Sequence, residues 1–211
     1  MQMLETPAFL EWSLKRGIGF DPRYPDSHEL CFLPPEDFSR FWTYPSGPET
    51  WPYFIDAILS GLDDWSTGVL WPRTGIWPSS KNSTFRHQKV RDIILRGAGV
   101  GDGVSGAILF ERAEEDVLLT ILYAYRALDF FFDDLFFVPD HGWQIIQASH
   151  HDVFHVEFSD DERMGEFIQH MKTKGYELPK VPPDWTFIWP SWMTQAEEDS
   201  VENIDSSEDI G

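Results

Sequence analysis

Most of the histidines in this chain fall within one short stretch, beside several carboxylates. They are His141, His150, His151 and His155, and the neighbouring acids are Asp140, Asp152 and Glu157. Imidazole and carboxylate groups are common general acids and bases, and both types of side chain bind zinc. This stretch is therefore the candidate for catalysis or for metal binding in the sequence.

Strand geometry limits which of these groups can act together. Two residues along an extended strand advance by about 6.6 Å, so His151 and His155 would lie roughly 13 Å apart. They cannot share one metal ion unless the chain turns between them. His155 and Glu157 lie on one face of an extended segment and are the candidate metal ligands, whereas His155 and His151 are the candidate catalytic residues. The alternative, which we favour, is a polar sheet edge or partner-contact surface that holds no metal and no cofactor.

A second group of acids surrounds phenylalanines in residues 129–140. Asp133, Asp134 and Asp140 flank runs of apolar residues. Aromatic side chains supply buried area in protein interfaces, and acids steer a basic partner into register. The predicted partner-binding set comprises these three aspartates together with His151, Asp152 and Glu157. The alternative is that the phenylalanines belong to the core and that the aspartates mark its ends.

The overall charge excludes some classes of partner. The 211 residues include 36 acids against 16 Lys and Arg, which gives a net charge of −20. Nucleic acids and anionic membranes attract clusters of cations, so we expect neither as a partner. Residues 73–96 are the exception, because they contain six cations and one acid. They form either an anion site or, as we favour, cations that pair with the protein's own acidic surface.

Cysteine content and apolar runs indicate the compartment. Cys31 is the only cysteine, so an internal disulfide and a cysteine-based zinc site are both excluded. We interpret Cys31 as a small buried hydrophobic residue rather than a reactive thiol. The N-terminal residues lack an apolar run of signal-peptide length, and charges interrupt the most apolar stretch, 117–138. We therefore expect a soluble, cytoplasmic protein.

The glycine-rich residues 97–106 contain two incomplete catalytic patterns. Residues 101–106 match G-x-G-x-x-G, and Ser105 lies near the nucleophile position of G-x-S-x-G. A dinucleotide site also needs a parallel β-α-β unit, whereas the strands that follow are predicted to form hairpins. The nucleophile pattern lacks its second glycine. We interpret this segment as a turn.

The local patterns predict an α+β protein in which an antiparallel sheet around 134–158 is packed by helices on one face. Tryptophan–proline pairs predict a loop or edge strand at 65–80, because proline excludes a central strand, and their tryptophans are expected to fill the core edge. Strands are predicted at 135–138, 143–148 and 153–158, with a hairpin loop at 140–142 and a turn at 149–152. Helices are predicted at 6–16, 34–42, 51–62, 114–128 and between Ser159 and Gly175, where Ser159 and Glu162 form a capping box.

These elements divide the chain into one domain and a tail. Residues 1–194 are expected to form a single domain, with a short-helix, Pro/Trp-rich region at 1–64, a loop or edge region at 65–106 and an α-β-β-(β)-α unit at 107–194. Aromatic residues between 185 and 192 are expected to anchor the chain against this domain. Residues 195–211 contain seven acids and no base, a composition typical of a disordered tail.

Three functions are consistent with the sequence. We favour an acidic protein that binds and neutralises a basic protein partner, as an immunity or antitoxin-type inhibitor of a toxin does, with fast and salt-sensitive binding. The second is a small metal- or histidine-dependent enzyme that uses residues 150–157. The third is an accessory protein whose acidity serves solubility only. Convergence of acids from 129–140 and 152–162 on one face with exposed aromatics would favour the first.

Overall fold

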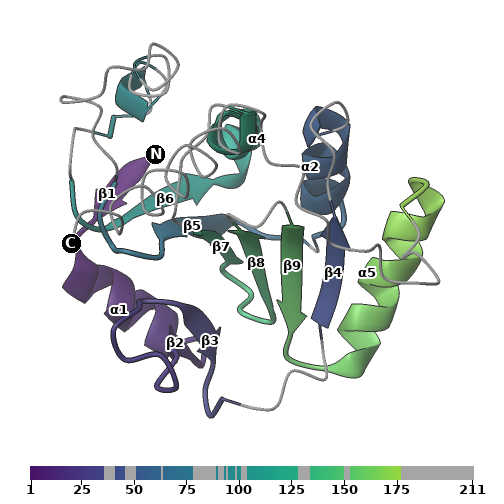
Figure 1. Cartoon of the computed structure of the whole chain (residues 1–211), viewed down its shortest axis with the longest axis horizontal. Helices are drawn as coiled ribbons and strands as arrows, with labels where there is room; N and C mark the ends of the chain where they lie inside the picture. Colours follow the sequence, from purple (N-terminus) through teal and green to yellow (C-terminus); the bar gives the residue numbers. More distant parts are fainter. Residues whose placement is uncertain are drawn as a thin grey trace, which may run out of the picture. The chain divides into compact units, whose positions relative to one another are not determined.

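The structure is a computed structural model that describes residues 1–35, 41–45, 51–62, 64–77, 104–127, 134–149 and 153–176, together with 89, 93, 95–97, 99 and 100. Seven of its nine described strands build one antiparallel sheet, which with the helices makes an α+β architecture (Figure 1). In spatial order the strands are β1 (Gln2–Leu4), β6 (Ala107–Glu111), β5 (Thr67–Pro72), β7 (Leu135–Pro139), β8 (Gln144–Ser149), β9 (Val153–Phe158) and β4 (Phe41–Pro45).

Helices cover one face of this sheet and a helix with a hairpin covers the other. The first face packs against α2 (Trp51–Ser60), α4 (Glu115–Ala127), which follows the short 3-10 turn η2 (Arg112–Glu114), and α5 (Asp161–Thr173). The second face packs against α1 (Thr6–Leu14) and the small sheet formed by β2 (Ile18–Phe20) and β3 (Leu30–Phe32). The helices α4 and α5 of the predicted α-β-β-(β)-α unit share the first face, as expected, whereas α1, which lies outside that unit, packs on the opposite face.

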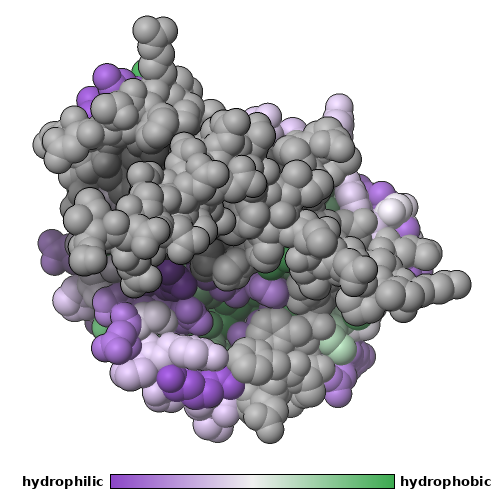
Figure 2. All heavy atoms as spheres, viewed as in Figure 1, coloured by the Kyte–Doolittle hydropathy of each residue, from purple (hydrophilic) through white to green (hydrophobic). Residues whose placement is uncertain are grey.

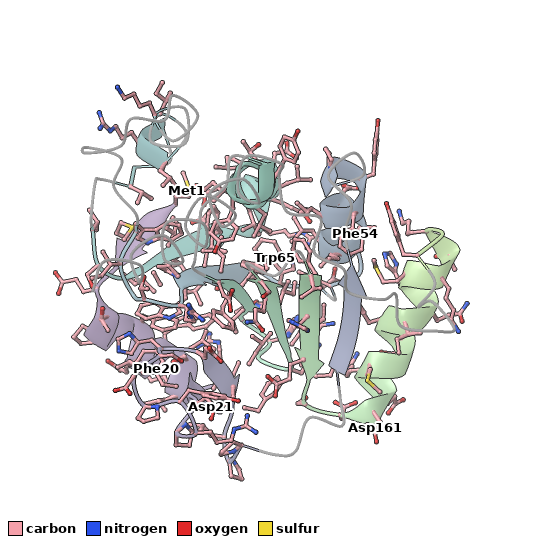
Figure 3. The ribbon with its side chains drawn as sticks, viewed as in Figure 1. Met1, Phe20, Asp21, Phe54, Trp65 and Asp161 are labelled. Carbon is pink, nitrogen blue, oxygen red and sulfur yellow. The ribbon has the colours of Figure 1, made fainter. Side chains whose placement is uncertain are left out.

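Alternation along the strands divides the sheet residues between two cores. On β7, Phe137 joins the core beneath α2, α4 and α5, whereas Phe136 and Val138 join the core beneath α1. Successive side chains of a strand point to opposite faces, so a strand covered on both faces is apolar throughout. Figure 3 illustrates the two sides, with Phe54 and Trp65 above the sheet and Phe20 below it.

The core beneath α1 is built on stacked aromatic rings. The rings of Phe9 and Trp71 lie 4.3 Å apart with an interplanar angle of 11°, and both side chains are fully buried. The indole N–H of Trp71 donates to the carbonyl oxygen of His28, at 3.0 Å, which ties the β2–β3 hairpin to β5. Trp77 is also fully buried, so the expected packing role of these tryptophans is confirmed at both positions.

The predicted helical N-terminal third is wrong in part. The helices at 6–16 and 51–62 are present as α1 and α2, but β1, β2, β3 and β4 occupy the same third of the chain. Residues 41 and 42, expected to end a helix, belong to β4, which pairs with β9 from Phe41 opposite Glu157 to Pro45 opposite Val153. Pairing with a strand more than 100 residues away overrides the local helical pattern.

The prediction of a loop or edge strand at 65–80 is also wrong for residues 67–72. These residues form β5, which lies inside the sheet between β6 and β7. Pro72 is tolerated because it is the last residue of β5, beyond Leu70 where the pairing with β6 ends. The ladder toward β6 therefore loses no donor to proline.

The second half follows the sequence patterns closely. The strands β7, β8 and β9 form the predicted meander, and Gly142 in the β7–β8 loop adopts a φ of 76°. The helix α5 begins one residue later than expected, because the carboxylate of Asp160 accepts the Arg163 N–H and takes the capping place predicted for Ser159. The turn at 150–152, the anchors at 185–192 and the tail at 195–211 lie outside the described residues. Among the described helices, none combines the length and the apolar character that crossing a bilayer requires.

Candidate functional site

A small polar cavity lies between the β2–β3 hairpin and the face of the sheet, and we call it the hairpin hollow. Its volume is about 40 Å³. The hairpin side contributes Asp21, Arg23, Glu29, Leu30 and Cys31, and the sheet contributes Phe136, Ile145, Gln147, His155 and Glu157. Where the sheet borders the hollow it carries the polar side chains of Gln147, His155 and Glu157. Beneath α1, by contrast, the same face is apolar.

Strand register places the sheet residues of the hollow. His155 lies opposite Gln147, and Glu157 lies opposite Ile145, in the antiparallel pair of β8 and β9. Directly opposed residues share a face, and His155 and Glu157 are two residues apart on one strand. The structure therefore brings these two sequence-derived candidates into one cavity.

The hairpin contributes a rigid ion pair. Arg23 donates from Nε and Nη2 to the carboxylate of Asp21, with the shortest distance 2.6 Å, and the Arg23 backbone N–H donates to Asp21 Oδ1 at 2.8 Å. These hydrogen bonds, made chiefly by the Arg23 side chain, hold the pKa of Asp21 below its usual value. Asp21 is only 4% exposed, and Figure 3 places it at the hairpin. The loop therefore presents Arg23 in a fixed orientation.

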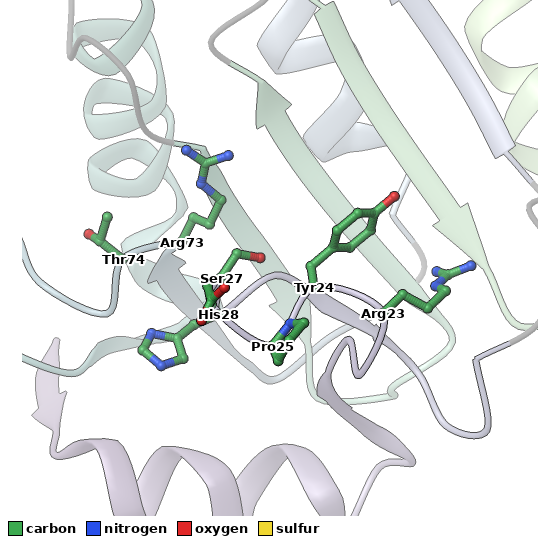
Figure 4. A pocket seen from close by; sticks show the side chains of 8 residues that line it. Arg23, Tyr24, Pro25, Ser27, His28, Arg73 and Thr74 are labelled. Atoms are coloured by element: carbon green, nitrogen blue, oxygen red, sulfur yellow. The ribbon is translucent and has the colours of Figure 1, made fainter.

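A larger cavity adjoins the hairpin hollow and shares Arg23 with it (Figure 4). It measures about 590 Å³ and is lined by Arg23, Tyr24, Pro25, Asp26, Ser27, His28, Arg73 and Thr74. Tyr24 is 48% exposed and provides an aromatic side chain at this rim. On the molecular face drawn in Figure 2, hydrophilic side chains predominate at the lower left, where α1 and the hairpin lie in Figure 1.

Asp134 of the predicted partner-binding set has a structural position. Its carboxylate is 3% exposed, accepts a hydrogen bond from Gln147 Nε2 at 2.8 Å and lies 3.9 Å from Arg73 Nη1. Arg73 also lies 3.6 Å from Glu29, so this cation of the basic segment pairs with the protein's own acids. Asp134 therefore holds Gln147, which lines the hollow, and does not present a free carboxylate to a partner.

Asp140 lies at the opposite end of β7 from Asp134. Its carboxylate accepts the Ser66 N–H at 3.0 Å, and its carbonyl oxygen accepts from Arg16 Nε at 2.9 Å. Asp134 and Asp140, which belong to one predicted partner-binding set, thus lie at opposite ends of β7. The remaining candidates, Asp133, His150, His151 and Asp152, lie outside the described residues.

The pKa of the Cys31 thiol reflects both its burial and the acidic groups around the hollow. Burial, followed by the charges of Asp21 and Glu157, raises the pKa of this thiol to about 12. Three carboxylates, from Asp21, Glu29 and Glu157, line the hollow. Asp21 pairs with Arg23, and Glu29 lies 3.6 Å from Arg73, so this group of described residues keeps one net negative charge. The hollow is therefore a region of negative potential, and the interpretation of Cys31 as a buried, unreactive residue is confirmed in its burial.

Imidazole and carboxylate groups such as those of His155 and Glu157 also bind metal ions. Across the described ranges, no three His, Cys, Asp or Glu side chains are grouped as ligands of one metal ion. Any third ligand for His155 and Glu157 would have to come from the rest of the chain.

Ser105 has a structural contact. Its hydroxyl donates to the carbonyl oxygen of Gly75 at 3.1 Å, and Ser105 forms an isolated bridge with Ile76. This hydroxyl fixes two loop segments to each other. Residues 101–103 of the glycine pattern lie outside the described part of the chain.

The sequence reasoning missed the hairpin half of the site. Asp21, Arg23 and Glu29 reach the hollow because the β2–β3 hairpin packs on the sheet, a contact across more than 100 residues. The only local signal was Asp21 before Pro22, a combination typical of a turn whose side chain bonds the backbone two residues later. Comparison of the chain with protein-family models, with curated proteins and with solved structures found no match.

Proposed function

We propose that the protein binds a basic protein partner and that the hairpin hollow receives a cationic side chain of that partner. The observation that carries the proposal is the convergence of Asp21, Glu29 and Glu157 on one cavity. Arg23 pairs with Asp21 and Arg73 lies beside Glu29, which leaves the charge of one carboxylate in excess among these described residues. Excess negative charge in a recess with apolar walls attracts cations more strongly than the same charge on a flat surface.

The dimensions of the hollow favour a lysine side chain. A cavity of about 40 Å³ exceeds the space that one water molecule requires and accommodates a compact ammonium group. A planar guanidinium carries a larger, rigid fork that needs a wider opening. Tyr24 at the neighbouring rim supplies an exposed aromatic surface, a residue type enriched at interface hot spots.

The narrower form of the proposal is that binding neutralises the partner, as an immunity or antitoxin-type inhibitor does. Its support is the net charge of −20, which steers a basic protein toward this surface and makes association fast and salt-sensitive. The net charge alone equally suits a protein whose acidity serves only solubility. Substitution of Glu157 distinguishes the two functions, because only partner binding in the hairpin hollow depends on this carboxylate.

The test is capture of a partner by matched charge variants. Tagged wild-type protein, Glu157→Gln and Glu162→Gln are each incubated with host lysate at low salt, eluted by a salt step and analysed by mass spectrometry. Both variants lose one negative charge, but Glu162 lies exposed in the first turn of α5. We expect wild type and Glu162→Gln to retain one basic protein in near-stoichiometric amount, and Glu157→Gln to retain about tenfold less. Equal retention by both variants, or no basic protein retained by wild type, would contradict the proposal.

A histidine-dependent activity is a second candidate, supported by the position of His155 beside Glu157 in the hollow. In its metal-dependent form it predicts about one divalent metal ion per purified chain, measured by elemental analysis, and loss of that metal in His155→Ala. Metal-free wild-type protein, or equal metal content in the variant, would exclude the metal-dependent form.

A further inference from the structure

A third cavity lies among α2, β8 and α5, and we call it the α5 hollow. Its volume is about 180 Å³, and its lining comprises Ser60, Gly61, Leu62, Gln144, Arg163, Glu166, Phe167 and His170. None of these residues lines the hairpin hollow or its adjoining cavity. The α5 hollow is therefore independent of the proposed partner site.

Gln144 is an unusual residue for its place in the fold. It lies opposite Phe158 in the β8–β9 pair, and Phe158 belongs to the core beneath the helices. Only 2% of Gln144 is exposed, and its Oε1 atom has no hydrogen-bond partner in the structure. A buried acceptor without a donor destabilises a fold, and an apolar residue of similar size would avoid that cost. Gln144 is also one of the residues that line the α5 hollow.

The C-terminal end of α2 and residues of α5 form one wall of the hollow. The imidazole Nε2 of His170 lies 3.1 Å from the Ala57 carbonyl oxygen and 3.3 Å from Ser60 Oγ. Ser60 ends α2, and the C-terminal end of a helix carries partial negative charge. The Glu166 carboxylate also lines the hollow, where it lies 3.3 Å from Arg163.

The one cation of the wall already has two partners. The guanidinium of Arg163 donates to Glu166 at 3.3 Å and lies 4.6 Å from the centre of the Trp143 ring. Packing also defines the shape of the cavity. A Cβ atom on Gly61 would lie 2.7 Å from the His170 ring, so glycine at this position allows His170 to approach the end of α2.

We propose that the α5 hollow binds a primary ammonium group, which donates to Gln144 Oε1 and lies beside the Glu166 carboxylate. A compact group with three N–H donors matches an orphaned acceptor, a carboxylate and a helix C-terminus better than an anion does. The volume of the hollow admits the ammonium together with a short alkyl chain.

The first test compares stability for two substitutions on the same strand. Gln144→Leu removes the unpartnered acceptor and is expected to raise the urea midpoint of unfolding. Gln147→Leu is the matched control and is expected to lower the midpoint, because Gln147 donates to the buried Asp134 carboxylate. A lower midpoint for Gln144→Leu would overturn the proposal, since it would show that the amide is satisfied in the free protein.

The second test measures binding of n-butylammonium by the amide and side-chain NMR shifts of the full chain. We expect saturable shifts centred on Gly61 and Gln144, with affinity at least tenfold weaker in Gln144→Leu and unchanged in Glu157→Gln, which alters only the hairpin hollow. Tetramethylammonium carries the same charge but no N–H donor, so it should neither bind there nor compete. Absence of saturable shifts, equal affinity in Gln144→Leu or competition by tetramethylammonium would overturn the proposal.

A third probe identifies the source of the ammonium group. Nα-acetyl-lysine amide presents the same group as a lysine of a peptide, with bulk at the other end of the chain. Binding of this probe alongside n-butylammonium would assign the site to a lysine side chain, and binding of n-butylammonium alone would assign it to a small free amine. Both outcomes support recognition of a primary ammonium group.

Discussion

Replacing Asp134 with alanine is expected to lower the free energy of unfolding by about 3 kcal/mol. The carboxylate is 3% exposed, accepts a hydrogen bond from Gln147 at 2.8 Å and lies near Arg73. Its removal leaves a partly buried amide donor, from Gln147, and the partly buried guanidinium of Arg73 without this partner. Urea unfolding followed by tryptophan fluorescence measures the loss, because Trp71 and Trp77 are fully buried.

The matched control for this substitution is Asp64→Ala. Asp64 is exposed, so the same chemical change there is expected to alter the free energy of unfolding by less than about 0.5 kcal/mol. Equal small effects at both positions would contradict the structural role of Asp134. They would return this residue to the partner-binding surface that the sequence indicated.

The second large effect concerns the reactivity of Cys31. At about pH 8 the native thiol is expected to react with Ellman's reagent about a thousandfold more slowly than the thiol of the urea-unfolded chain. The thiolate is the reactive species, and burial, followed by the charges of Asp21 and Glu157, raises the native pKa from 9.0 to about 12. Comparable rates for the folded and unfolded chains would contradict both the burial of Cys31 and the negative potential of the hairpin hollow.

The same pKa shift gives the stability a dependence on pH. Below about pH 9 the thiol is protonated in both states and contributes no dependence. As the pH rises from about 9 toward about 12, the unfolded chain loses this proton while the native protein retains it, so the free energy of unfolding falls. Cys31→Ala lacks this component, and the difference between the two unfolding curves isolates it from the titration of lysines and tyrosines.

Local sequence patterns predicted the elements that are joined by short connections. The meander β7–β8–β9 follows from apolar runs separated by turn residues, and α5 follows from apolar residues at helical spacing that end before Gly175. By contrast, β4 and β5 depend on pairing with distant strands, and their tryptophans and prolines indicate loops or helices when read locally. Non-local pairing thus explains both errors.

The sequence also predicted the part of the candidate site that lies on one strand, but not the part that the hairpin contributes. The two-residue spacing of His155 and Glu157 implies a shared face once the segment is extended, and the hollow contains both. The sequence does not reveal that Asp21 and Glu29 join them, because the β2–β3 hairpin reaches the sheet only through tertiary packing. Nor does it reveal that Asp134 is buried, because that depends on Gln147 and Arg73, which lie on neighbouring segments of the sheet.

The central claim is that Glu157 and its neighbours in the hairpin hollow bind a cationic group of a basic protein. The most direct test is calorimetric titration of the purified captured partner into wild type, Glu157→Gln and Glu162→Gln at roughly 50 mM and roughly 200 mM salt. The proposal predicts that Glu157→Gln weakens the Kd at least about tenfold and reduces its salt dependence, whereas Glu162→Gln leaves the Kd within about twofold of wild type. The same Kd for all three proteins would contradict a binding role for the hairpin hollow.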